Sequence, residues 1–304
     1  MPNHHAHAPE PAPPREASLT IHARDGYPLS ANLFLPEGVP TGVVLLNAAT
    51  AVPQTFYTSF ARWLAELGFA AMTWDYRGFG TSLHGPLRDA KNDICSWGTL
   101  DAPAILDALH ERFPDLPLTW IGHSVGAHLP GFIDNPQRIQ RMLSVASGSG
   151  YWGTLNPRVR LKSIILWGAL APISTSIVGY FPGRRLGILD DVPRGVIAEW
   201  RRWSLHPKYM LRDDEAQRRA GYARYTFPLH MLSFEDDELM TKKSTEFIRS
   251  LYVNAQITHR RLRPDEQSRP VGHLGWFRKE NRDMWEKHLQ TWLQATPEQS
   301  HAHR

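Results

Sequence analysis

The stretch LTWIGHSVGAHLPGFI (118–133) decides the fold. Its first part, LTWIGHS (118–124), is an apolar run with the length of a buried strand, and residues 125–133 predict a helix. Between them GHSVG (122–126) is a Gly-x-Ser-x-Gly motif, which is typical of a sharp strand-to-helix turn that exposes a serine hydroxyl. Small glycines let the strand and the helix approach each other closely. Because such short matches also arise by chance, an ordinary glycine-rich turn remains the alternative for this motif alone.

The rest of the chain alternates between strand and helix patterns. Residues 18–24 and 29–35 alternate around Asp25-Gly26, which predicts a β-hairpin. Apolar runs predict further strands at 42–47, 69–75, 141–147, 228–234 and 255–262. Longer amphipathic segments predict helices near 52–67, 99–112, 241–251 and 281–293. This alternation predicts the α/β class, with a mostly parallel sheet covered by helices on both faces.

Composition excludes several classes of protein. With 304 residues, 42% hydrophobic and 21% charged, the chain is globular and is long enough to bury a full core. The single cysteine, Cys95, excludes a disulfide framework and a cysteine-rich zinc site. A net charge of +4 without a Lys/Arg run argues against a nucleic-acid partner. Residues 1–17 and 297–304 are expected to be disordered tails, and the lack of a leader pattern favours a cytoplasmic location.

Three further segments accompany the serine motif in a fixed order. DYRGFGTS (75–82) follows a strand, SFEDDELMT (233–241) follows a later strand, and VGHLGWF (271–277) follows the last one. With these segments the chain resembles serine hydrolases of the α/β-hydrolase superfamily, related to serine aminopeptidases and monoglyceride lipases. The resemblance covers 18–149 and 227–296, which we expect to form the hydrolase core.

The resemblance implies a triad of Ser124, an aspartate and His273, in that chain order. The imidazole of His273 would take the serine proton as general base, and the carboxylate would orient the imidazole. Asp236 and Asp237 are adjacent, and only one of them can point at His273. The superfamily usually places the acid three residues after the small residue that ends the strand. Counting from Ser233 favours Asp236 as the acid, with Asp237 as the alternative.

An oxyanion hole needs two N–H donors directed at the developing negative charge. The resemblance implies the backbone N–H of Val125 as one of them. The other should come from NAATAVPQ (47–54), where this chain lacks the His-Gly pair found in many relatives. Alignment of residues 47–48 with that pair makes the N–H of Ala49 the expected donor and that of Thr50 the alternative.

Other residues near these motifs receive no chemical role. Asp75, Arg77 and Gly78 belong to a turn that is structural in the superfamily, where the arginine joins loops by hydrogen bonds. His123 is expected to pack beneath the serine, and His128 to lie on the helix surface or the pocket floor.

The segment 150–226 is too long for a plain crossover and is predicted to form a cap (lid) inserted between strands 6 and 7. Its 13 basic and six acidic residues either favour anionic substrates or form a solvated surface. Residues 163–183 carry no charge and have the length of a membrane span. Because the segment contains proline, glycine and hydroxyl residues, we expect no stable insertion into a membrane. We expect it instead to line an apolar acyl pocket, and contact with a lipid surface is left open.

These features together predict a serine hydrolase that works without a cofactor or metal through a covalent acyl-enzyme. Carboxylic esters are the first expectation for a small-molecule substrate, then thioesters, with amides less favoured. An aminopeptidase or acyltransferase variant of the same chemistry remains an alternative, because a fold does not specify its function. A non-catalytic small-molecule binder and a lipid-surface protein are the alternatives from other classes, and the oligomeric state stays open.

Overall fold

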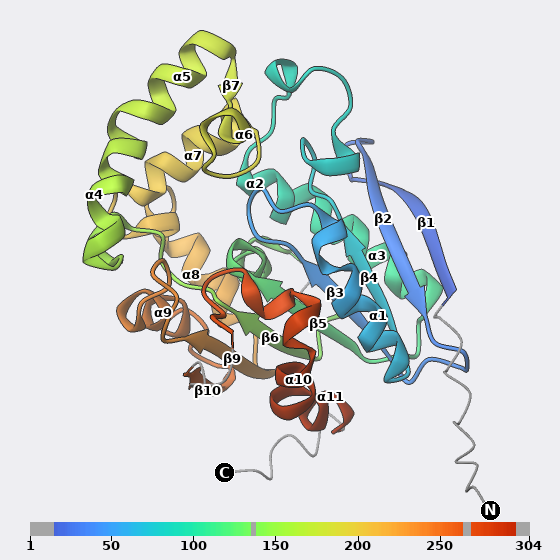
Figure 1. Ribbon diagram of the computed structural model, residues 1–304. Coiled ribbons are helices and arrows are strands. Elements are labelled where there is room, and N and C mark those ends of the chain that lie inside the picture. Colours follow the sequence, from blue (N-terminus) through green and yellow to red (C-terminus); the bar gives the residue numbers. More distant parts are fainter. Residues whose placement is uncertain (1–14, 135–137, 264–268, 296–304) are drawn as a thin grey trace, which may run out of the picture.

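An eight-stranded, mostly parallel sheet forms the centre of the molecule (Figure 1). The computed structural model describes residues 15–134, 138–263 and 269–295. The strands follow the order β1-β2-β4-β3-β5-β6-β9-β10 across the sheet. The pairs β1–β2 and β2–β4 are antiparallel, whereas all pairs from β4 to β10 are parallel. This is the sheet of the predicted α/β class.

The strands lie where the apolar runs predicted them. They are β1 (Arg15–His22), β2 (Pro28–Leu35), β3 (Gly42–Asn47), β4 (Phe69–Trp74), β5 (Leu118–His123), β6 (Arg141–Val145), β9 (Pro228–Phe234) and β10 (Gln256–Leu262). β1 starts earlier than expected, because residues 15–17 of the predicted tail pair with β2. The remainder of that tail and all of 297–304 lie outside the described residues.

Helices cover both faces of the sheet (Figure 1). They are α1 (Thr58–Glu66), α2 (Ile94–Ser96), α3 (Ala102–Arg112), α4 (Pro157–Ile165), α5 (Ala171–Val178), α6 (Gly183–Leu186), α7 (Arg194–Ser204), α8 (Glu215–Ala223), α9 (Lys242–Arg249), α10 (Arg282–Trp285) and α11 (Thr291–Gln294). One expected helix differs: residues 125–133 form two short 3-10 turns, Ser124–Ala127 and Leu129–Phe132. Pro130 explains the break, because it has no N–H to continue a helix.

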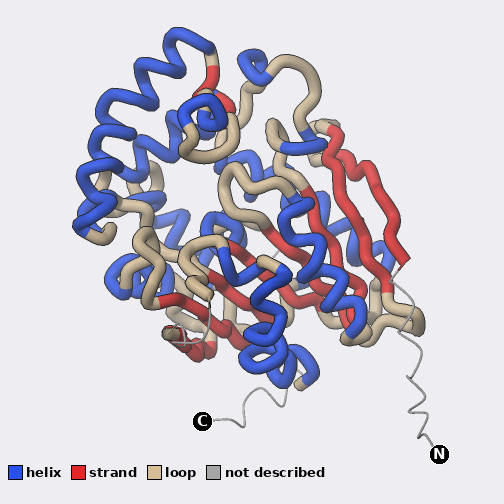
Figure 2. Tube along the Cα trace, in the orientation of Figure 1, coloured by secondary structure: helices blue, strands red, loops and turns tan. Residues whose placement is uncertain are grey.

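Residues 146–227, called the insertion below, leave the sheet after β6 and return to it at β9. The insertion holds α4 to α8 and a two-stranded ribbon of β7 (Tyr180–Phe181) and β8 (Val192–Pro193). It is mostly helical and lies on the opposite side of the molecule from the β1–β2 hairpin (Figure 2). The predicted cap, 150–226, falls within it, and its boundaries as a domain remain a prediction.

A buried carboxylate fastens the insertion to the core. Glu199 of α7 accepts hydrogen bonds from the backbone N–H groups of Ile94 and Cys95 at 2.6 and 3.1 Å. Its second oxygen accepts the thiol of Cys95 at 2.8 Å. The side chain of Glu199 therefore caps the start of α2 from across the insertion–core boundary.

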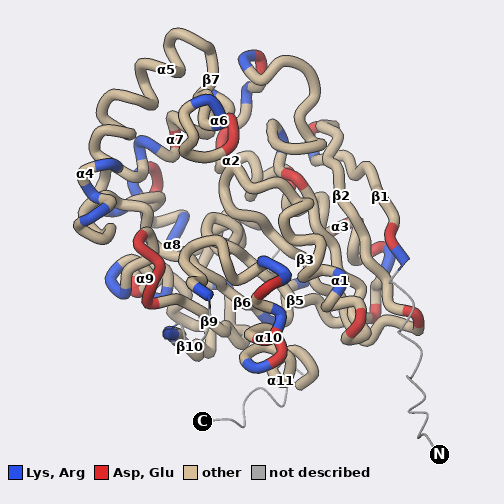
Figure 3. Tube along the Cα trace, in the orientation of Figure 1, with Lys and Arg blue, Asp and Glu red and all other residues tan. Residues whose placement is uncertain are grey.

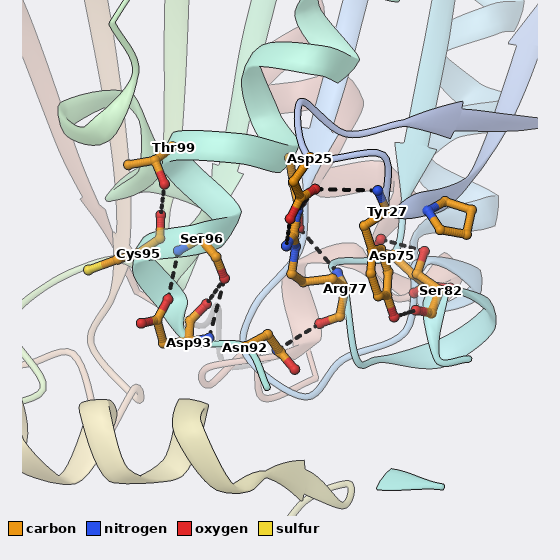
Figure 4. Close-up of polar contacts among 12 residues, drawn as sticks. Asp25, Tyr27, Asp75, Arg77, Ser82, Asn92, Asp93, Cys95, Ser96 and Thr99 are labelled. Atoms are coloured by element: carbon orange, nitrogen blue, oxygen red, sulfur yellow. Dashed lines mark hydrogen bonds and ion pairs between the residues drawn. The ribbon is translucent and has the colours of Figure 1, made fainter. Parts of the chain in front are cut away.

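The turn after β4 joins three loops, as the sequence predicts. The guanidinium of Arg77 makes two hydrogen bonds to Asp25, at 2.7 and 2.9 Å, and its Nε donates to Asp101 at 2.7 Å. The backbone carbonyl of Arg77 accepts from Asn92 at 3.0 Å, and Figure 4 shows Arg77 between Asp25 and Asn92. The role of Arg77 in this structure is thus to hold the β1–β2 hairpin against the core.

Candidate active site

Ser124 occupies the sharp turn predicted for it. It follows β5 directly and has a left-handed backbone with φ of 52°, which is costly for a residue other than glycine. The neighbouring glycines are needed for space. A Cβ on Gly122 would lie 2.4 Å from the nitrogen of Ala127, and one on Gly126 would lie 2.2 Å from the carbonyl oxygen of Asn47. The GHSVG pattern therefore reflects real steric limits at this turn.

Side chains from three other elements hold this strained turn in place. Ser147 Oγ donates to the carbonyl of Ser124 at 2.8 Å, and Trp120 Nε1 donates to the carbonyl of Gly126 at 2.9 Å. The hydroxyl of Tyr252 donates to the carbonyl of Ala127 at 3.0 Å. These bonds offset the backbone strain, so that the half-exposed side chain of Ser124 faces the cavity described below.

His273 pairs with Asp237, and the expectation of Asp236 is wrong. Nδ1 of His273 lies 2.9 Å from Oδ2 of Asp237, and the Asp237 side chain is completely buried. The count from Ser233 failed because Ser233 is not the last residue of the strand: β9 ends at Phe234, as the predicted strand 228–234 does. Three residues beyond Phe234 is Asp237.

Asp236 binds the backbone of the same loop instead. Its Oδ2 accepts the N–H groups of Val271 and Gly272 at 2.7 and 2.9 Å. Gly272 has a φ of 54°, so the loop bends sharply just before His273. The two adjacent aspartates thus hold one loop, Asp236 through its backbone and Asp237 through the imidazole.

The surroundings of Asp237 keep its carboxylate ionised. Burial on its own would raise the pKa of Asp237, but His273 and two backbone N–H groups outweigh burial and lower that pKa below its usual value. Leu239 and Met240 donate these N–H groups to Oδ1, each at 2.9 Å. A buried, ionised and fully bonded carboxylate against an imidazole is suited to fix the tautomer of that imidazole.

The loop after β3 differs from the prediction. The N–H of Ala49, the expected oxyanion donor, is already bonded to the hydroxyl oxygen of Tyr57 at 2.9 Å. The N–H of Thr50 makes no hydrogen bond within the described part of the chain, and Thr50 lines the cavity beside Ser124. Tyr57 escaped the sequence analysis because an aromatic residue in a helix pattern ordinarily belongs to the core.

Asn47, which aligns with the histidine of the His-Gly pair, bonds to neighbouring strands. Its amide nitrogen donates to the carbonyls of Leu45 and Ile121, both at 3.2 Å, and its amide oxygen accepts from Trp74 Nε1 at 3.0 Å. Asn47 therefore joins β3 to β5 and to β4 at the end of the sheet where Ser124 emerges.

A cavity of about 590 Å³ opens beside Ser124 and His273. The core contributes the Ser124 turn, the loop of Ala49 to Val52 and the loops that carry Leu239, Met240 and Leu274, and the insertion contributes large apolar residues between Leu155 and Trp200. The apolar lining comprises Val52, Leu155, Leu166, Trp167, Ile188, Leu189, Trp200, Leu239, Met240 and Leu274. Within the described ranges, no group of three or more His, Cys, Asp or Glu side chains is placed to hold a metal ion.

Comparison with known proteins identifies a matching family model and several solved structures with a similar fold. The family model described as "Serine aminopeptidase, S33" matches residues 39–220. A comparison with curated proteins gave no significant match.

Solved structures resemble the chain in fold. A thermostable carboxyl esterase from Bacillus coagulans has a TM-score of 0.59 at 13% identity, covering 91% of this chain and 97% of the esterase. The Pyrococcus furiosus esterase Pf2001 has a TM-score of 0.58 at 13% identity, covering 92% and 90%. Est816, described as an N-acyl homoserine lactone degrading enzyme, has a TM-score of 0.58 at 16% identity, covering 90% and 100%. At these identities the likeness establishes a shared fold.

Proposed function

Because the chain belongs to the serine aminopeptidase S33 family of α/β hydrolases, we propose that this hydrolase cleaves carboxylic esters of apolar acyl chains with Ser124, His273 and Asp237. The observation that carries the proposal is the 2.9 Å pair of His273 and Asp237 on the same cavity as the strained Ser124 turn. A strained serine beside a carboxylate-bound imidazole is the arrangement that nucleophilic acyl transfer requires.

The proposed reaction has two halves. Nδ1 of His273 is held by Asp237, so Nε2 is the nitrogen that takes the proton from Ser124 as Oγ attacks the ester carbonyl. The tetrahedral intermediate collapses to an acyl-serine, and Nε2 returns the proton to the departing alkoxide. Water, deprotonated by the same nitrogen, then attacks the acyl-serine. As the C–Oγ bond breaks, Nε2 returns that proton to Ser124 Oγ and the carboxylic acid is released.

The negative oxygen of each tetrahedral intermediate needs donors that are free in the resting protein. We assign this role to the N–H groups of Val125 and Thr50, because that of Ala49 is bonded to Tyr57. Each such donor is typically worth about 3 kcal/mol in the transition state.

The apolar wall of the cavity supports an acyl-chain substrate. We expect kcat/KM for p-nitrophenyl esters to rise roughly 10- to 100-fold from acetyl to octanoyl, because each added CH₂ that is buried contributes up to about 0.8 kcal/mol. Steady-state hydrolysis of an ester series, with matched thioesters and aminoacyl p-nitroanilides, measures this. Preference for the anilides would replace the esterase proposal with an aminopeptidase. Binding of the esters without their hydrolysis would favour a non-catalytic binder.

A second candidate activity, contact with an anionic lipid surface, is favoured by one helix of the insertion. Pro157–Val178 is long and apolar enough to cross a membrane, yet much of it faces outward, with Leu161, Ile173 and Ile177 exposed by 66, 58 and 78%. Between residues 151 and 189 the chain carries five basic and no acidic residues. Figure 3 shows α5 without charge and basic residues on α4 and α6. An apolar face with flanking cations suits binding in the plane of an anionic interface.

We propose that this helix lies on the surface rather than crossing the bilayer, because both of its ends are bound to the same folded domain. Near its start, the N–H of Asn156 donates to the carbonyl of Glu238, and beyond its end β7 pairs with β8. A spanning helix would place these two ends on opposite sides of a membrane.

Flotation with vesicles tests this contact. We expect the protein to float with phosphatidylglycerol-containing vesicles and not with pure phosphatidylcholine, and the double variant Ile173→Gln/Ile177→Gln to lose most of that binding. Val39→Gln is the matched control, because Val39 is 89% exposed on the core and outside the insertion. Equal flotation of all three proteins would contradict the assigned surface.

A further inference from the structure

A buried chain of three hydrogen bonds runs beneath the candidate active site. The N–H of Ala49 meets the hydroxyl oxygen of Tyr57 at 2.9 Å, and the same hydroxyl lies 2.8 Å from Nδ1 of His123. Nε2 of His123 lies 2.9 Å from the backbone carbonyl oxygen of His273. The chain therefore joins the oxyanion loop, the residue that precedes Ser124, and the backbone of the candidate general base.

The direction of every bond in this chain is fixed by chemistry. A carbonyl oxygen only accepts, so Nε2 of His123 must carry a proton and donate it to His273. A neutral imidazole then has an acceptor at Nδ1, which takes the O–H of Tyr57. The oxygen of Tyr57 in turn accepts the N–H of Ala49. Each side chain donates once and accepts once, so a single tautomer satisfies the whole chain.

Burial keeps both side chains neutral. His123 has no exposed surface and Tyr57 only 2%. Burial lowers the pKa of His123 to about 3 and raises the pKa of Tyr57 above its usual value. Phe277 packs against both rings, with centroid separations of 4.9 Å in each case. The two rings are therefore held in position by packing as well as by hydrogen bonds.

We propose that Tyr57 and His123 are positioning residues, which set the backbone of His273 and of the oxyanion loop relative to Ser124. The inference rests on the proposed function and adds residues to it. Displacement of reacting groups by about 1 Å is enough to lower an enzymatic rate about 100-fold. With the N–H of Ala49 bonded to Tyr57, the next residue, Thr50, lines the cavity, and its N–H makes no hydrogen bond within the described part of the chain.

Isosteric variants separate the two bonds of His123. His123→Gln places an amide N–H near the position of Nε2 and keeps a donor for the His273 carbonyl. His123→Asn places an amide oxygen near the position of Nδ1 and keeps only an acceptor for the Tyr57 hydroxyl. His123→Phe and Tyr57→Phe preserve the ring shapes and remove the bonds. Tyr225→Phe is the matched control, since it also removes a buried hydroxyl that donates to a backbone carbonyl, that of Pro130 at 2.8 Å.

The measurement is kcat and KM for one ester, with active sites counted by titration with a fluorophosphonate, together with the midpoint of thermal unfolding. For Tyr57→Phe, His123→Phe and His123→Asn we expect kcat per titrated site to fall about 10- to 100-fold while KM changes less than about three-fold. His123→Gln should recover most of that loss. Tyr225→Phe should lower the unfolding midpoint with kcat per site unchanged.

If the wild type is active, two results would overturn this inference and leave the proposed function standing. One is a kcat within two-fold of the wild-type value for both Tyr57→Phe and His123→Phe. The other is a loss of kcat in Tyr225→Phe equal to the loss in those two variants. A folded wild type that neither hydrolyses esters nor reacts with the fluorophosphonate would overturn the proposed function and this inference with it.

Discussion

Replacing Ser124 with alanine is expected to abolish labelling by a fluorophosphonate and to lower ester hydrolysis about 10⁴-fold or more. The reason is that the alanine variant has no oxygen that can attack the carbonyl, so neither the acyl-serine nor the phosphonyl adduct can form. The fold should survive, because the Ser124 contact that braces the turn is made by its backbone carbonyl, which the variant keeps.

Mass spectrometry of the labelled wild-type protein should place the adduct on Ser124, and circular dichroism checks the fold of the variant. Ser147→Ala is a suitable control, because Ser147 lies against the same turn and donates to the Ser124 carbonyl at 2.8 Å. This control should still be labelled. An adduct on any other serine, or unchanged hydrolysis by Ser124→Ala, would reject the assigned nucleophile.

Replacing Asp237 with asparagine should lower kcat by about 10⁴-fold, whereas Asp236→Asn should lower it less than about 10-fold. Asparagine at 237 removes the negative charge beside Nδ1 of His273 and permits the wrong imidazole tautomer. Asparagine at 236 keeps an oxygen that can accept the N–H groups of Val271 and Gly272. The adjacent pair of variants thus separates orientation of the imidazole from support of its loop.

Both variants should be compared at equal folded fraction, measured by thermal unfolding, since Asp236 and Asp237 are each bonded to backbone groups. The pKa of Asp237 lies below its usual value, so its carboxylate stays ionised throughout the neutral range and the comparison holds from about pH 6 to 9. A larger loss from Asp236→Asn than from Asp237→Asn would reverse the assignment.

The sheet and the Ser124 turn could be predicted because their signals are local. Apolar runs such as residues 42–47 and 118–123 are fully buried strands, and a strand buried on both faces has no polar positions to obscure it. The glycines on either side of Ser124 follow from steric contact within a few residues and across one neighbouring strand.

Asp237 as the partner of His273 was only the alternative from the sequence, and the bond from the Ala49 N–H to Tyr57 was not predicted. The count was taken from Ser233 as the small residue, whereas β9 ends one residue later at Phe234, and a count from there reaches Asp237. The bond from Ala49 to Tyr57 depends on how the following helix packs beneath the sheet edge. No pattern in the sequence specifies either contact.

Glu199 fixes the position of one wall of the cavity. Raising α7 from the core would strip one buried carboxylate of three hydrogen bonds, at a cost of roughly 5 kcal/mol. α7 and its Trp200 are therefore held against the core. The helix Pro157–Val178 is bound to α7 in turn, because Arg201 Nε donates to the carbonyl of Trp167 and the rings of Trp167 and Trp200 are in contact. The helix that carries the exposed apolar face therefore also supplies Leu166 and Trp167 to the cavity wall, and its position depends on the same buried carboxylate.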